Sequence, residues 1–103
     1  MSCGANGAQP KVLLTEAGTG NATETFVARS SRGWDLHWSY DCGGQGLFVV
    51  DVFRSDRTPD FEHPGVNEEG DNDSAVYHVP EAGLFYLEVT TTCAWTLKVV
   101  ESA

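Results

Sequence analysis

The stretch that most constrains the fold is residues 34–42, in which large apolar and polar side chains alternate at every position. The even positions from Trp34 to Cys42 are apolar, and the odd positions, including Asp35 and His37, are polar. Successive side chains of a β-strand point to opposite faces, so the pattern predicts a strand with one buried aromatic face and one solvated face. No ten-residue segment shows the 3.6-residue period of an amphipathic helix, and we therefore expect an all-β chain.

Similar short apolar or β-branched runs recur along the chain, separated by turns rich in Gly and Pro. They predict further strands at residues 11–16, 21–30, 47–53, 74–79, 84–91 and 93–100, with a short strand at 65–67 as an additional candidate. We expect 47–53 to form a hairpin with 34–42. The last two strands should form a hairpin or one long bent strand. Seven to eight short strands predict an antiparallel β-sandwich of jelly-roll or immunoglobulin-like connectivity.

The length and charge of the chain limit its organisation and its partners. Its 103 residues predict one domain, residues 11–103, preceded by a flexible leader at residues 1–10. The formal net charge is -9, and the six basic residues are scattered. Nucleic acid and anionic lipid surfaces are therefore not expected partners, because both bind clustered Lys and Arg. We expect a monomer.

Two of the three cysteines lie in predicted strands. Cys42 ends the aromatic strand, and Cys93 is in phase with Trp95, Leu97 and Val99. We expect the two thiols, on apolar faces of two strands, to form an inter-sheet disulfide. Closing a loop of ~50 residues would stabilise the fold by about 4 kcal/mol, and the bond would imply an oxidising compartment. The alternative is two free buried thiols, because Cys behaves as a small apolar residue.

Cys3 lies in the predicted leader, after Met1 and Ser2 and before the Gly-containing run 4–7. Small residues before a Cys and a flexible tether after it are typical of the processed start of a bacterial lipoprotein, in which that Cys carries the lipid. On this interpretation Met1 is not the native start, and the protein meets the membrane only through the lipid. The alternative is an odd free cysteine in a flexible tail.

Residues 54–73 lack strand periodicity, apart from the candidate strand at 65–67, and contain many acidic residues and two prolines. We therefore expect a long loop, which is more often functional than neutral in a compact domain. Its carboxylates at Glu68, Glu69, Asp71 and Asp73 are candidate ligands for Ca²⁺, which takes six to eight oxygen ligands. The spacing of a dedicated calcium-binding loop is absent, and a solvated acidic turn is the alternative.

The sequence offers little support for catalysis or for a zinc site. The three histidines, His37, His63 and His78, are far apart in the sequence, with no close His-x-His or Cys-x-x-Cys pair, and we expect them at or near the surface. There is no G-x-S-x-G elbow and no phosphate-binding Gly-rich loop. We therefore expect no enzyme activity.

Aromatic residues are the remaining candidates for binding. All three tryptophans, Trp34, Trp38 and Trp95, have the apolar parity of their strands and are expected in the core. Tyr86 shares a face with Leu84 and Glu88, a more exposed composition. An exposed patch of Tyr77, Leu84 and Tyr86 is therefore the candidate interaction site.

Three segments give the chain its resemblance to a known class of protein: residues 23–27, residues 34–38 leading to Cys42, and residues 83–89 before 93–95. They resemble small bacterial secreted or lipid-anchored β-sandwich domains, including the pre-peptidase C-terminal modules of exported proteases. The resemblance covers residues 23–100 except the segment 54–73. It implies a non-catalytic role in targeting, surface attachment or binding.

These observations predict an extracytoplasmic binding or interaction module of the bacterial cell envelope. Its ligand would be a protein or a glycan. The alternative function is a calcium-stabilised structural domain that uses the acidic segment 68–73.

Overall fold

The computed structural model describes residues 11–55 and 65–102, which form six β-strands and no helix. The strands are β1 (Lys11–Thr19), β2 (Ala22–Ala28), β3 (Trp34–Arg54), β4 (Gly65–Val79), β5 (Gly83–Thr91) and β6 (Ala94–Glu101). All pairings are antiparallel, in the order β1-β6-β3-β5-β2 with β4 paired to β3. The all-β antiparallel prediction is confirmed, whereas the described residues form six strands and not seven to eight.

The strand count is lower because β3 joins two segments that we expected to be separate strands. Residues 34–42 and 47–53 belong to one continuous strand and are not the arms of a hairpin. Residues 34–41 pair with β6, and residues 48–54 pair with β5. The two parts meet at an irregularity in which residues 42–45 stand opposite a single residue of β4, Asp71. Such a bulge bends a strand, and here it lets β3 serve two parts of the sheet.

Residues 65–73 of the predicted loop form a strand, whereas residues 56–64 of that prediction lie outside the described residues. β4 runs from Gly65 to Val79 and pairs with β3 on both sides of the bulge. Acidic residues have low intrinsic β-propensity, but the ladder of backbone hydrogen bonds to β3 outweighs that preference. The candidate short strand at 65–67 is therefore the start of β4, and the predicted strand 74–79 is its end.

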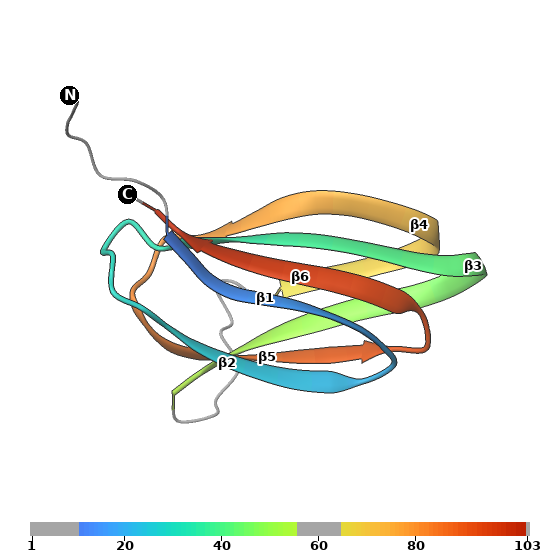
Figure 1. Cartoon of the computed structure of the whole chain (residues 1–103), viewed down its shortest axis with the longest axis horizontal. Helices are drawn as coiled ribbons and strands as arrows, with labels where there is room; N and C mark the ends of the chain where they lie inside the picture. The colour runs from blue at the N-terminus through green and yellow to red at the C-terminus, as the bar shows by residue number, and fades with distance from the viewer. Residues whose placement is uncertain (1–10, 56–64, 103) are drawn as a thin grey trace.

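The sheet folds over on itself at one end, so that its strands lie in two layers (Figure 1). The first layer contains β1, β6, residues 34–41 of β3 and residues 72–79 of β4. The second layer contains β2, β5, residues 46–54 of β3 and residues 65–70 of β4. The chain passes between the layers at Gly20–Asn21, at the bends of β3 and β4, and at Thr92–Cys93; we call this end the fold line.

The last two strands differ from both expectations. β5 and β6 are neither a hairpin nor one long bent strand, because they pair with different parts of β3. Thr92 and Cys93 carry the chain across the fold line between them. Gly20 and Asn21 cross the fold line in the same way, between β1, which pairs with β6, and β2, which pairs with β5.

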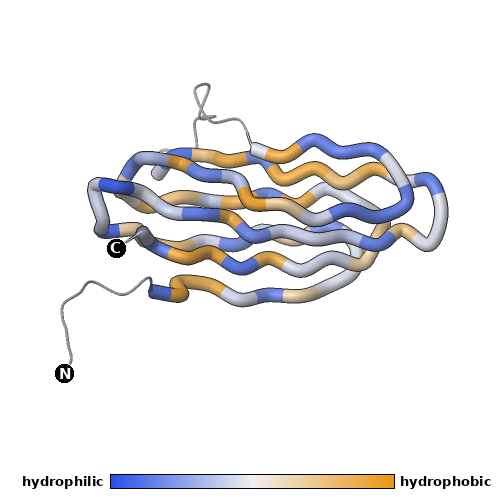
Figure 2. The backbone as a smooth tube through the Cα atoms, turned by 90° about the horizontal axis from the view of Figure 1, so that it is seen from above, coloured by the Kyte–Doolittle hydropathy of each residue, from blue (hydrophilic) through white to orange (hydrophobic). Residues whose placement is uncertain are grey.

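The hydrophobic core lies between the layers. Hydrophobic and hydrophilic residues alternate along much of the strands (Figure 2), and the hydrophobic ones supply the core. The predicted aromatic face of β3 is confirmed, since Trp34, Leu36, Trp38 and Tyr40 are at most 6% exposed. The indole of Trp34 packs edge-on against Phe26, with ring centroids 4.7 Å apart. Leu13 and Leu14 of β1 pack against the core and are partly buried. The other buried core side chains come from β2 to β6: Ala28, Phe48, Val50, Val52, Val66, Val79, Phe85, Leu87, Val89, Trp95, Leu97 and Val99.

Candidate interaction face

Leu84 and Tyr86 of the predicted patch lie side by side on the outer surface of β5. The residues that alternate with them, Phe85 and Leu87, are buried in the core. Leu84 is 36% exposed, and Tyr86 is half-buried. The structure therefore brings these two side chains together on the solvent side of the second layer.

Tyr77 lies elsewhere. It stands opposite Leu36, which is fully buried, and therefore points toward the core side of the sheet. Its phenol oxygen accepts a hydrogen bond from the backbone N–H of Gly65 at 3.3 Å. Since β3 separates β4 from β5, the structure does not place Tyr77 on the same surface as Leu84 and Tyr86.

Two residues that the sequence did not single out complete the surface. Val27 of β2 stands directly opposite Leu84, and Phe53 of β3 stands directly opposite Tyr86. Val27 is 48% exposed, and Phe53 is half-buried. We call the set Val27, Phe53, Leu84 and Tyr86 the Tyr86 face. Alternation within β2 and β3 was visible in the sequence, but the pairing that joins these residues was not.

Polar groups border the Tyr86 face. A hollow of about 170 Å³ is lined by Thr23, Phe53, Tyr86 and Glu88. Asp51 of β3 stands directly opposite Glu88 in the β3–β5 pairing. The surface thus combines aromatic rings, a small hollow and two neighbouring carboxylates.

The acidic residues of β4 are distributed over both sides of the strand. Glu69, Asp71 and Asp73 are exposed, whereas Glu68 is half-buried on the core side opposite Phe48. Within residues 11–55 and 65–102, no group of three or more His, Cys, Asp or Glu side chains is arranged to hold a metal ion.

The acidic segment nevertheless acts on one nearby phenol. The pKa of Tyr40 is raised above its usual value, first by burial and then by the negative charges of Glu68, Asp73 and Asp71. A Cβ atom on Gly70 would come within 3.5 Å of the Tyr40 hydroxyl. Three carboxylates therefore influence one small region at the bend of β4.

The histidines do not converge in the described part of the chain. His78 contacts Asp35 across the β3–β4 pairing, with 2.5 Å between Nδ1 and Oδ1. His37 is exposed on the first layer, opposite Val76 and Lys98. His63 lies outside the described residues.

The outer surface of the first layer carries a depression of about 720 Å³. Its lining includes Ser39, Thr96 and Val76, and the hydroxyls of Ser39 and Thr96 are 2.5 Å apart. Val76 is 54% exposed. The residues that line this depression include neither a pair of exposed aromatic side chains nor a pair of carboxylates. In this respect the depression differs from the Tyr86 face and its border.

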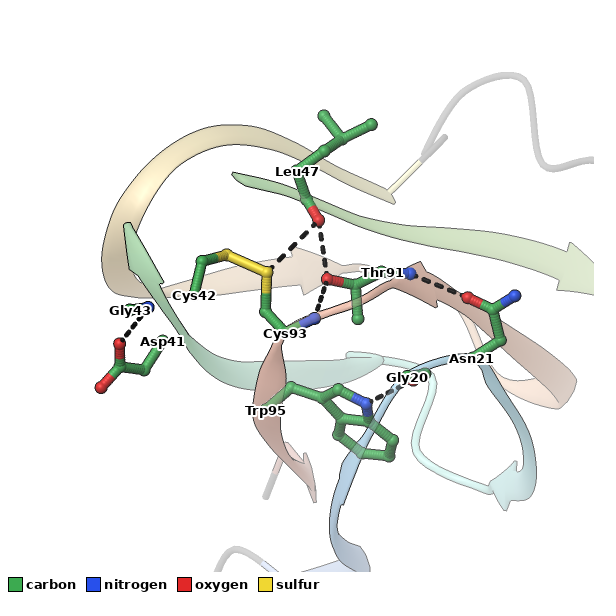
Figure 3. The surroundings of a disulfide bond; sticks show 9 residues. All are labelled: Gly20, Asn21, Asp41, Cys42, Gly43, Leu47, Thr91, Cys93 and Trp95. Atoms are coloured by element: carbon green, nitrogen blue, oxygen red, sulfur yellow. Dashed lines mark hydrogen bonds between the residues drawn. A yellow bond between two sulfur atoms is a disulfide. The ribbon is translucent and has the colours of Figure 1, made fainter. Parts of the chain in front are cut away.

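The predicted Cys42–Cys93 disulfide is present, with an S–S distance of 2.00 Å and a sequence separation of 51. It lies at the fold line, where it joins the bulge of β3 to the turn between β5 and β6 (Figure 3). Cys93 therefore precedes β6 and is not its first residue. A disulfide is compatible with an oxidising, extracytoplasmic compartment.

No family model matches the chain, and no curated protein matches it. In the described part of the chain no helix is long and apolar enough to span a membrane. Cys3 and the rest of the expected leader, residues 1–10, lie outside the described residues.

Proposed function

We propose that this protein is a non-catalytic, extracytoplasmic β-sandwich module of the bacterial cell envelope that binds a protein or a glycan through the Tyr86 face. The observation that carries the proposal is the cross-strand alignment of Val27 with Leu84 and of Phe53 with Tyr86 on one solvent-facing surface. Apolar and aromatic side chains gathered on a polar protein surface are typical of interaction sites.

The disulfide supports the proposed location, since such bonds persist mainly outside the reducing cytoplasm. A targeting or surface-attachment role, as in the pre-peptidase C-terminal modules that the sequence resembles, fits a module of this kind. A lipid on Cys3 would hold it at the membrane. Intact mass of the protein exported from its host would test both features: we expect a lipid mass and a loss of two hydrogens, whereas three free thiols would contradict the location.

Retention of the labelled protein on the envelope fraction of a bacterial host tests the binding face. We expect Tyr86→Ser and Leu84→Ser to reduce retention. The matched control is Val76→Ser, which removes an exposed apolar side chain from the first layer. Treating the envelope with protease or with periodate separates a protein ligand from a glycan ligand. Equal retention of all variants, with unchanged melting temperatures, would contradict the proposal.

The alternative function is a calcium-stabilised structural domain, and it is supported by the nearness of three negative charges: after burial, Glu68, Asp73 and Asp71 each raise the pKa of Tyr40. An ion that binds only the native state raises its stability by RT ln(1 + [L]/Kd). Under this alternative, calcium should raise the melting temperature relative to chelator, and Asp71→Asn with Asp73→Asn should remove the shift. Under the binding proposal, calcium and chelator should give the same melting temperature.

A further inference from the structure

Two carboxylates face the same side of the second layer as directly opposed neighbours. Asp51 of β3 and Glu88 of β5 form one cross-strand pair, and both side chains point outward, since the residues that alternate with them are buried. Like charges directly opposite one another destabilise an antiparallel pair. This arrangement therefore weakens the free protein and would be relieved by a cation.

Aromatic rings lie immediately beside this acidic pair. Phe53 and Tyr86 form the next outward pair along the same two strands, two residues from Asp51 and Glu88. The hollow of about 170 Å³ is lined by both rings, by Glu88 of the acidic pair and by Thr23. Ring faces attract ammonium and guanidinium groups within about 6 Å of the ring centre. The surface thus offers charge, ring faces and space for one cationic group.

No side chain of the described strands in this layer supplies that cation. Arg54 is the one basic residue within β2, β5, residues 46–54 of β3 and residues 65–70 of β4. It stands opposite the buried Phe85, on the other side of the strand, and forms an ion pair with Glu81 at 3.0 Å. The complementary charge must come from outside these strands.

We infer that the Tyr86 face binds a protein partner through a basic side chain, best an arginine, inserted between the Phe53–Tyr86 rings and the Asp51–Glu88 carboxylates. Guanidinium groups suit such a site because they are planar, stack on aromatic rings and donate to two carboxylate oxygens at once. The net charge of -9 favours the approach of a basic partner. This inference rests on the proposed function and names the class of ligand for it.

The test is an NMR titration of the whole protein with the tripeptide acetyl-Thr-Arg-Thr-amide and with its citrulline analogue, which has the same shape without the charge. We expect the arginine peptide to shift the amide signals of residues 51, 53, 86 and 88, and added salt to weaken binding. The double variant Asp51→Asn with Glu88→Gln should weaken binding about 3- to 10-fold. Glu69→Gln, which removes a carboxylate on the same side of the layer near Leu47, should leave it unchanged.

Equal binding of the two peptides, shifts centred on the acidic residues of β4, or no shifts at all would overturn the inference. A second readout needs no ligand: the Asp51→Asn with Glu88→Gln variant should melt at a higher temperature than the parent, because the repulsion is removed. Suppose that Tyr86→Ser is no longer retained on the envelope while the Asp51→Asn with Glu88→Gln variant is retained as fully as the parent. The proposed binding face would then hold, and the inference of a cationic partner would be contradicted. Retention lost after periodate but not after protease would instead assign a glycan.

Discussion

The hydroxyl of Thr91 donates a hydrogen bond to the backbone carbonyl of Leu47 at 2.6 Å and accepts one from the backbone N–H of Cys93 at 3.0 Å. The hydrogen bond to Leu47 joins β5 to β3 beside the disulfide (Figure 3). Thr91 itself is only 7% exposed. A single polar side chain thus satisfies two backbone groups where the chain leaves one layer for the other. Buried polar groups left without partners are costly, which makes this position sensitive.

Thr91→Val should destabilise the protein by about 2–3 kcal/mol, because it keeps the side-chain shape but leaves the carbonyl of Leu47 and the N–H of Cys93 without these partners. The matched control is Thr90→Val, whose side chain is exposed on the neighbouring position. Chemical denaturation of both variants measures the difference. Equal midpoints for the two variants would show that the Thr91 hydroxyl contributes nothing to stability.

Removing the disulfide should have a larger effect. Replacing Cys42 and Cys93 with alanine opens a loop that spans 51 positions, and the expected loss is about 4 kcal/mol of the free energy of unfolding. Denaturation of the parent with and without reductant, compared with the double variant, measures it. We expect the reduced parent and the double variant to be similarly unstable, and a parent unaffected by full reduction would contradict the prediction.

A glycine is needed at position 46 because the disulfide leaves no room for a side chain there, and not because the backbone of this residue has a positive φ. A Cβ atom at this position would lie 2.5 Å from Sγ and 2.8 Å from Cβ of Cys42, and 2.9 Å from Sγ of Cys93. Gly46→Ala should therefore cost about 1–3 kcal/mol by overpacking. The cost should fall in part in the variant with alanine at both cysteine positions, because the two sulfur atoms are removed while Cβ of residue 42 stays. A double-mutant cycle measures this coupling.

Gly43→Ala is the control for that cycle. Its φ of 64° favours glycine, but a Cβ atom there would meet nothing within 4 Å. The expected cost is about 1 kcal/mol from the backbone alone. It should be the same with and without the disulfide, and a cost that depends on the cysteines would contradict this assignment.

Glu101 should make stability depend on pH. Its carboxylate accepts hydrogen bonds from the backbone N–H groups of Arg29 and Ser30, the latter at 2.8 Å, and these bonds lower its pKa. Because the folded pKa is below the unfolded value of about 4.3, the stabilisation is present above that value and is lost as pH falls through the folded pKa. Glu101→Gln should therefore be less stable than the parent at neutral pH, and the gap should close in acid.

The comparison between parent and variant is needed because other groups titrate in the same range. The pKa of Glu24 is raised by burial and by the charge of Glu16, so its contribution changes with pH in the opposite sense. Denaturation midpoints of the parent and of Glu101→Gln between pH 7 and pH 3 isolate the Glu101 contribution. A gap that stays constant over this range would contradict the assignment.

Alternation was the feature of the sequence that carried most structural information. It predicted the buried aromatic face from Trp34 to Tyr40, the outward positions of Leu84 and Tyr86 and the burial of Trp95. The prediction worked because one face of each strand packs against the core and the other faces solvent, so that apolar residues occupy the first and polar residues the second. The partner of Cys42 followed from the same argument.

The same pattern could not show where a strand ends if its middle is acidic or rich in glycine. Residues 43–46 and 68–73 resembled a turn and a loop in the sequence. They lie instead at the bends of β3 and β4, because pairing between these strands satisfies their backbone groups. Tyr77 was placed on the wrong surface for a related reason. Its face is set by its position opposite Leu36, which is a contact between distant segments.

By itself, then, the sequence determined that the chain is all-β, which side of the apolar strands is buried, and that Cys42 and Cys93 lie where a disulfide can form. Only the tertiary structure decided that the strands number six in the described residues, that the sheet folds at one line, and that Val27 and Phe53 join Leu84 and Tyr86. The division has a physical cause. Side-chain parity is a local property of an extended backbone, whereas register depends on which distant strands share hydrogen bonds.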